Sequence, residues 1–211
     1  MRIVLLSLLL FTSLKSLSQL NPDVAKRVDA INKISNDSVR IDSLFNYSNT
    51  LYETALPQAN QVVDLAMEQA QEAKSEHHIG RGHIALSYRN LQQGNYPVAL
   101  KHALAALNIF HKRKNYLQES FALSFLVEIY RVTNDLPKAL KYARQSSDIA
   151  HQHIPILRAK AESLGTLGII YRSMGKPEQA IPIFDSALAI LRKDVDDANN
   201  KYERTRILGN I

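Results

Sequence analysis

The sequence contains no cysteine, and it has only 7 glycines and 7 prolines among 211 residues. Without cysteine the chain can form no disulfide, no thiolate metal site, no cysteine nucleophile and no lipid-modified N-terminal cysteine. The low glycine and proline content excludes a disordered or loop-built chain. The length suits one globular or solenoid domain.

A large excess of one charge is also absent. The 26 basic and 20 acidic residues give a formal net charge of +6, and no run of five or more like charges occurs. The densest basic cluster is Lys112-Arg113-Lys114, which we interpret as a solvated turn between helices. A small charge with both signs scattered favours solubility and argues against a nucleic-acid partner.

The longest apolar run lies at the N-terminus and is too short to cross a membrane. One basic residue precedes residues 3–11, which are apolar apart from Ser7 and have about the length of a signal-peptide core. Ser16 and Ser18 then provide the small side chains that cleavage after Ser18 requires. We therefore predict a signal peptide over residues 1–18 and an exported, periplasmic or extracytoplasmic protein, with an uncleaved anchor as the alternative.

An internal repeat runs through the remaining chain. The pattern bulky–Pro–x–Ala occurs three times at a constant spacing along the chain. In a fourth copy the alanine comes one residue later than this spacing predicts, and it follows its proline by three positions instead of two. A leucine precedes each of the later three alanines at a constant distance. The alanines are Ala59, Ala99, Ala139 and Ala180, and the leucines are Leu86, Leu126 and Leu167. Two landmarks that keep one register through three units establish the repeat.

Each repeat unit predicts two helices. Between residues 120 and 131 the apolar residues Leu123, Leu126, Val127 and Tyr130 share one helical face. A proline then starts the second helix, where its missing N–H costs nothing. Residues that tolerate a left-handed backbone occupy the turn between the two helices: Gly94, Asn134 and Gly175.

The ends of the repeat region have their own features. Asn21-Pro22 predicts an amphipathic capping helix within residues 19–39. At the other end, Leu208-Gly209 repeats Leu167-Gly168, so a further unit begins there and we expect a longer protein. The repeat domain covers residues 40–211, with units near 40–79, 80–119, 120–160 and 161–201 and a further start at 202–211.

The last complete unit resembles a tetratricopeptide repeat beginning at Ala161. The family pattern is met at Leu167, Gly168, Tyr171, Gly175, Ala180, Phe184 and Ala187. This resemblance implies an all-α fold, a right-handed α-solenoid of antiparallel helix pairs. The period, about 40–41 residues, exceeds the roughly 34 of the standard repeat. The longer period implies a longer second helix or loop. Repeats with this lengthened spacing resemble those in the sensor regions of some bacterial signalling proteins.

The resemblance also implies a concave groove lined by the first helix of each unit. The family's groove positions, carried onto this chain, include Ile84, Glu162 and Ile169 and six residues that we select as candidates for partner binding: Arg81, Tyr88, Phe121, Glu128, Arg131 and Arg172. Large planar side chains with donors are favoured binding anchors. An alternative for Arg131 and Arg172 is that they only solvate a helix flank.

Signatures of catalysis are missing. No phosphate-binding loop, nucleophile elbow or kinase motif occurs, so we predict a protein that is not an enzyme and has no cofactor. The histidine clusters, His77-His78 with His83 and His151–His153, have neither HExxH spacing nor a carboxylate partner. We interpret them as exposed histidines and predict no metal site.

Three functions are compatible with such a solenoid. The first is an exported scaffold that binds a protein or peptide. The second is the extracytoplasmic sensor part of a membrane signalling protein, a histidine kinase or transcriptional regulator, continuing past Ile211. The third, an RNA-binding repeat, is disfavoured by export and by the modest charge. A membrane contact is expected only if the chain continues into a transmembrane segment.

Overall fold

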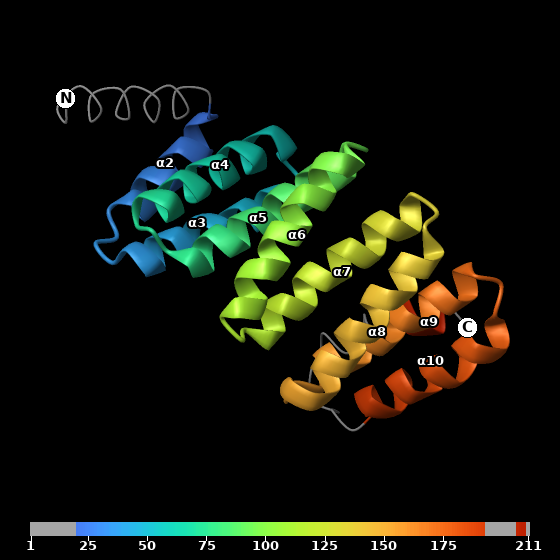
Figure 1. Ribbon diagram of the computed structural model, residues 1–211. Coiled ribbons are helices and arrows are strands. Elements are labelled where there is room, and N and C mark those ends of the chain that lie inside the picture. The colour runs from blue at the N-terminus through green and yellow to red at the C-terminus, as the bar shows by residue number, and fades with distance from the viewer. Residues whose placement is uncertain (1–19, 193–205, 210–211) are drawn as a thin grey trace. The chain divides into compact units, whose positions relative to one another are not determined.

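The computed structural model describes residues 20–192 and 206–209, and every regular element in these ranges is a helix (Figure 1). The expected all-α helical-repeat solenoid is therefore confirmed as the fold class. The predicted signal peptide, residues 1–18, lies outside the described residues. None of the described helices is both long enough and apolar enough to cross a membrane.

The helices belong to two compact units that divide within α5, between Leu86 and Ser87. The first unit contains α2 (Pro22–Asn32), α3 (Asp37–Leu51), α4 (Leu56–Glu72) and the start of α5 (Glu76–Gln92). The second contains the end of α5, then α6 (Tyr96–Lys112), α7 (Tyr116–Val132), α8 (Leu136–His153), α9 (Leu157–Ser173) and α10 (Pro177–Arg192).

The first unit begins with the capped helix that the sequence indicates. The Asn21 side chain accepts a hydrogen bond from the Val24 backbone N–H at 2.9 Å, and Pro22 occupies the first helical turn. The buried face of α2 packs on the first helix pair, where it joins one apolar core with α3 and α4: Val24, Val28, Ile31, Ile41, Leu44, Phe45 and Val62. This helix covers an apolar face that a helix pair would otherwise expose.

In the described part of the chain, residues with a left-handed backbone follow the helix ends at five turns. The predicted turn residues Gly94, Asn134 and Gly175 all have positive φ, at 72°, 61° and 70°. The turns after α4 and α6 use lysine in the same conformation, Lys74 and Lys114, which the sequence did not indicate. In each turn the next residue's N–H returns to a carbonyl in the last helical turn, as in the 3.0 Å bond that closes the turn at Lys114.

The long period is shared by both helices of a repeat. The second helices α6 and α8 have 17 and 18 residues, and the first helices α5, α7 and α9 have 17 each. The extra position of the last period lies in α8, which has 18 residues where the corresponding helix α6 has 17.

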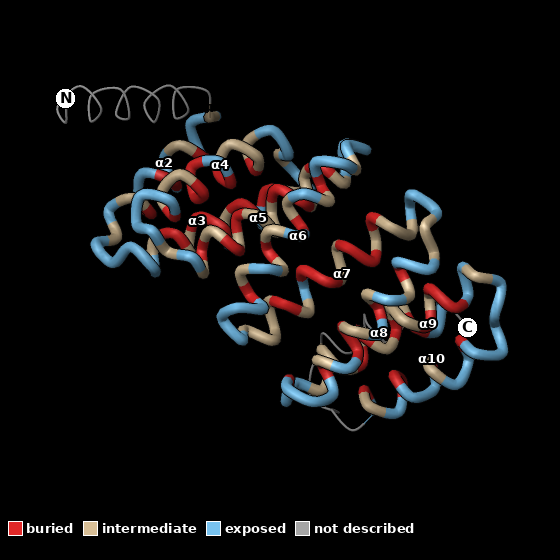
Figure 2. The backbone as a smooth tube through the Cα atoms, in the orientation of Figure 1, coloured by how far each residue is buried: buried red, intermediate tan, exposed pale blue. Residues whose placement is uncertain are grey.

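Small residues let the paired helices approach closely. The repeat alanines Ala99, Ala139 and Ala180 are buried on the second helices. Ser87 donates a hydrogen bond of 3.0 Å to the carbonyl of Ala99, which satisfies a hydroxyl that is fully buried. Figure 2 shows the buried residues along the helices and the exposed residues at the turns. The packing follows the rule that close helix axes need small side chains at their crossing.

The last described segment joins the core of the second unit. Ile207 is 1% exposed and packs with residues of α9 and α10, among them Tyr171, Phe184 and Leu191. By contrast, Leu208 is well exposed. The apolar core of the second unit thus includes a residue that follows α10 in the chain, Ile207.

Candidate interaction surface

One face of α7 in the second unit lies between two hollows. The first hollow, about 370 Å³, lies between α5 and α7. It is lined by aromatic and apolar side chains (Tyr88, Leu91, Tyr96, Phe125 and Val132) and by the polar side chains of Gln92, Ser124 and Glu128. The second hollow, about 320 Å³, lies between α7 and α9, which are first helices of successive repeats. Ser124 lines both hollows, so they flank one continuous strip of α7.

An aromatic pair forms the wall of the first hollow. The rings of Tyr88 and Phe125 meet edge to face, with centroids 6.2 Å apart and planes at 72°. Edge-to-face is a preferred arrangement of aromatic rings, and the pair presents a large apolar area. This hollow therefore suits a bulky apolar side chain of a partner.

A clamped carboxylate lies beside that wall. Arg131 donates two hydrogen bonds to Glu128, of 2.7 and 2.6 Å, from Nε and Nη2. This fork raises the pKa of Arg131 above its ordinary value, because the hydrogen bonds to Glu128 favour the charged guanidinium. Glu128 lines the first hollow, and its charge is matched by an arginine on the same helix.

The second hollow is lined by hydroxyl groups and by charged side chains of both signs. Ser120 and Ser146 share a hydrogen bond of 2.9 Å, and Ser163 and Thr166 also line the cavity. Arg158 donates to Glu162 at 2.8 Å along one rim. The Ser163 and Thr166 hydroxyls already donate to the carbonyls of Lys160 and Glu162. Their oxygens therefore remain as acceptors for the N–H groups of an extended peptide.

Phe121 provides an exposed apolar anchor at the second hollow. Its side chain lines the hollow and is 44% exposed, which is unusual for a residue of this size. Three of the six residues predicted from the sequence, Tyr88, Phe121 and Glu128, thus lie at the two hollows. Arg131 contributes indirectly, through its fork on Glu128.

The other two predicted residues lie elsewhere. Arg172, at the end of α9, is exposed and lines neither hollow. Arg81 belongs to the first unit, where its guanidinium pairs with Asp42, donates to Asn46 at 3.2 Å and lies 5.2 Å from the centroid of the Phe45 ring. It therefore links α5 to α3 and is not a free anchor.

Helical periodicity could have identified two residues at the hollows, Ser124 and Phe125, that were not predicted from the sequence. Ser124 and Phe125 lie three and four positions after Phe121, and Glu128 follows Ser124 by four. Positions three and four apart share a helix face, so extending from Phe121 along α7 would have found the strip. The candidates taken from the family's groove positions include neither Ser124 nor Phe125.

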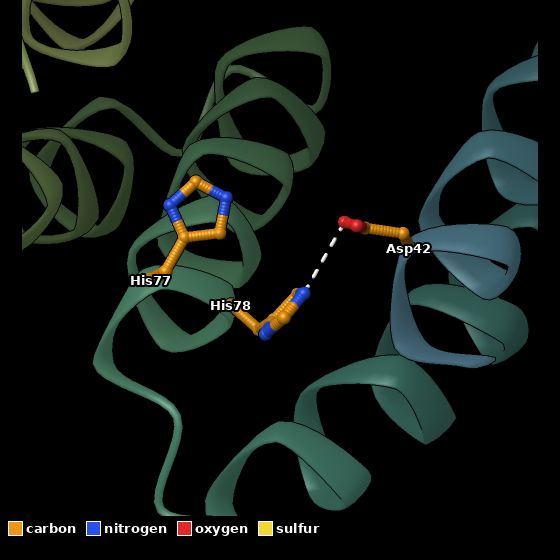
Figure 3. Close-up of side chains that lie close together, drawn as sticks. All are labelled: Asp42, His77 and His78. Carbon is orange, nitrogen blue, oxygen red and sulfur yellow. Dashed lines mark ion pairs between the residues drawn. The ribbon is translucent and has the colours of Figure 1, made fainter. Parts of the chain in front are cut away.

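The histidine clusters differ from the expectation in one place (Figure 3). His151 and His153 are exposed, as expected. His78, however, is only 3% exposed, and its Nε2 lies 3.2 Å from a carboxylate oxygen of Asp42. The interpretation of His78 as an exposed histidine without a carboxylate nearby is wrong. Asp42 belongs to α3, so local sequence spacing gives no sign of it.

Comparison with known proteins agrees with this fold. Residues 163–198 match the family model described as tetratricopeptide repeat. No curated protein matches the sequence. The fold is similar to the crystal structure of BtubC (BKLC) from P. vanneervenii, with a TM-score of 0.65 and 13% identity, covering 81% of this chain and 71% of that one.

The matched residues contain most of α9 and all of α10, the pair in which the tetratricopeptide pattern is met position by position. Helix pairs of the same design precede it in both units. Residues 163–198 thus match a tetratricopeptide repeat, and the described residues form an all-α helical-repeat fold.

Proposed function

We propose that this protein is an exported scaffold that binds an extended protein or peptide partner along the strip of α7 between the two hollows. The observation that carries the proposal is the pairing of an aromatic hollow with a hydroxyl-lined hollow on one helix face. The first would take a bulky apolar side chain, and the second would hydrogen-bond the peptide backbone. Tetratricopeptide repeats in general mediate protein–protein interaction, which agrees with a binding role and not with catalysis.

The binding test compares exposed residues on different faces of the second unit. Peptides are selected on the wild-type chain from a random display library, and their Kd is measured by fluorescence polarisation. Phe121→Ala and Tyr88→Ala are expected to weaken binding about tenfold or more, the loss typical of a buried aromatic anchor. Leu104→Ala is the matched control, because Leu104 on α6 is 41% exposed and lines neither hollow.

Two results would overturn this assignment of the surface. One is a panel of selected peptides whose affinities survive both Phe121→Ala and Tyr88→Ala. The other is an equal loss in the Leu104→Ala variant, which would indicate a general effect on folding. Thermal unfolding of each variant separates lost contacts from lost structure.

Export is proposed on the pattern of residues 1–18. Fusing residues 1–40 to a phosphatase that is active only after export is expected to give an active reporter. The mature fusion is expected to begin at Gln19. Replacing Leu8 with Arg in the apolar core is expected to abolish that activity, because a charge there blocks insertion. Full activity of the Leu8→Arg fusion would contradict export by this segment.

The alternative is that the same surface belongs to the sensor part of a signalling protein that continues past Ile211. Ile207 packs against α9 and α10, where the next first helix of the repeat would lie, and this packing is compatible with both functions. The coding sequence after Ile211 decides between the two. An apolar stretch of about 20 residues followed by a kinase or DNA-binding segment selects the sensor.

A further inference from the structure

The first unit brings two imidazoles and a carboxylate together where α3 meets the start of α5 (Figure 3). His77 and His78 come from the first turn of α5, and Asp42 comes from α3. One potential ligand atom from each side chain lies within 4.8 Å of the other two. Two histidines with one carboxylate are a common ligand set for borderline divalent metal ions.

His78 and Asp42 already have the spacing of two ligands on one ion. Metal–ligand bonds to nitrogen and oxygen are about 2.0–2.2 Å long, so two ligands on a tetrahedral ion lie about 3.4 Å apart. The His78 Nε2 to Asp42 Oδ1 distance is 3.2 Å. Movement of these two side chains is therefore unnecessary for a shared ion.

The second nitrogen of His78 is also held as a metal ligand requires. His78 Nδ1 lies 2.6 Å from the Ser75 hydroxyl. A ligating histidine almost always makes such a hydrogen bond with its other nitrogen, which fixes the tautomer and the ring orientation. Without a metal, Nε2–H donates to the Asp42 carboxylate and the Ser75 hydroxyl donates to Nδ1. A metal ion on Nε2 would replace that proton, and Nδ1–H would then donate to the Ser75 hydroxyl.

His77 is the side chain that has to move. Its ring meets that of His78 edge to face, with centroids 5.2 Å apart, and the residue is only half-buried. Ligand atoms up to 4.8 Å apart have to approach by up to about 1.4 Å to reach tetrahedral spacing, which is within the range of a side-chain rotation.

We propose that Asp42, His77 and His78 form a binding site for a borderline divalent metal ion, for which Zn²⁺ is the probe. Three protein ligands leave a fourth position for water or for a donor from a partner. The ion would join α3 to α5, the first helices of successive repeats, and would stabilise the first unit.

Arg81 limits the affinity of this site and provides a sharp test of it. Its guanidinium pairs with Asp42, so it opposes a second cation at the same carboxylate. Removing the arginine while keeping the fold is expected to increase metal affinity. A purely structural hydrogen-bond network would show no such gain.

The experiment titrates Zn²⁺ into the full chain, purified without a histidine tag and stripped with a chelator, and measures binding by calorimetry. The wild-type protein is expected to bind one ion. His77→Gln and Asp42→Asn are expected to lose more than the about 10–100-fold that removal of a supporting hydrogen bond costs. Arg81→Gln is expected to bind several-fold more tightly than the wild type.

His151→Gln is the matched control, because it removes an exposed histidine on α8 in the other unit. Its affinity is expected to equal that of the wild type. His77→Gln is preferred to a change at His78, because burial of His78 makes folding sensitive to that change. Co²⁺ absorption in the visible range provides a second readout of nitrogen and oxygen coordination.

Three outcomes would overturn the site: no Zn²⁺ binding by the wild-type chain, binding that His77→Gln and Asp42→Asn leave unchanged, or an equal loss in His151→Gln. Failure of the peptide-binding test leaves this proposal untouched, because the two surfaces lie in different units.

Discussion

Gly168 of α9 lies directly against the ring of Phe184 of α10: a Cβ placed on Gly168 would come within 2.5 Å of the Phe184 Cε1 atom. Phe184 is 1% exposed and is enclosed by Ala180, Ala187 and Leu188 in the same core. A close-packed core leaves such a ring little room to move. The absence of a side chain at Gly168 therefore allows α9 and α10 to approach this closely.

Replacing Gly168 with alanine is expected to destabilise the protein by about 1–3 kcal/mol, because an extra methyl group in a packed core forces strain. Gly82→Ala is the comparison. A Cβ at Gly82 would meet the sulfur of Met67, and a methionine side chain can change rotamer. Urea unfolding should therefore rank Gly82→Ala above Gly168→Ala in free energy of unfolding. The reverse order would contradict this account of the helix pair.

Glycine at Lys74 or Lys114 is expected to stabilise the protein. Both lysines have positive φ, 51° and 53°, and this conformation costs an L-residue about 1–2 kcal/mol. Glycine avoids that cost but loses about 0.5–1 kcal/mol through its freer unfolded chain, so a net gain of about 0.5 kcal/mol is expected. Lys101→Gly within α6 is the control, with an expected loss of about 1 kcal/mol. Thermal unfolding that ranks all three variants alike would refute the turn argument.

His111 is expected to stabilise a buried carboxylate. Glu119 is 1% exposed, and its carboxylate lies 2.8 Å from His111 Nδ1, although the His111 side chain is 73% exposed. Replacing His111 with alanine leaves that carboxylate without this partner and should cost about 1–3 kcal/mol in urea unfolding. His151→Ala should change stability by less than about 0.5 kcal/mol. Equal effects would show that the pair contributes nothing.

His102 is expected to make stability depend on pH. Burial lowers its pKa, and the charges of Lys101 and Arg89 lower it further. As pH falls, the unfolded chain therefore takes up this proton before the folded one does. The stabilising contribution is complete above the ordinary histidine pKa of about 6.5 and is lost as pH falls toward the lower folded value.

The matching measurement compares the free energy of unfolding at about pH 7.5 and about pH 5.5 for the wild type and for His102→Asn. The variant should lose less stability between these two values, because it lacks the proton uptake at this residue. An identical loss in both proteins would assign the pH dependence to other histidines.

Much of the helical architecture could be predicted from local chemistry. Asn21 caps a helix, and Gly94, Asn134 and Gly175 end helices with positive φ, as their residue types indicate. The candidate surface was only partly predictable. Tyr88, Phe121 and Glu128 lie at the hollows, but Phe125 was missed and Arg81 is engaged within the first unit.

The sequence by itself determined the repeat, its period and the positions of the small residues, because helix periodicity, capping and turn chemistry act over a few neighbouring residues. Only the tertiary structure decided which charged side chains pair with one another within the protein. Arg81 and His78 both meet Asp42, which lies almost one repeat earlier in the chain. Polar side chains interact with groups that are near in space, and the packing of the helices determines which groups are near.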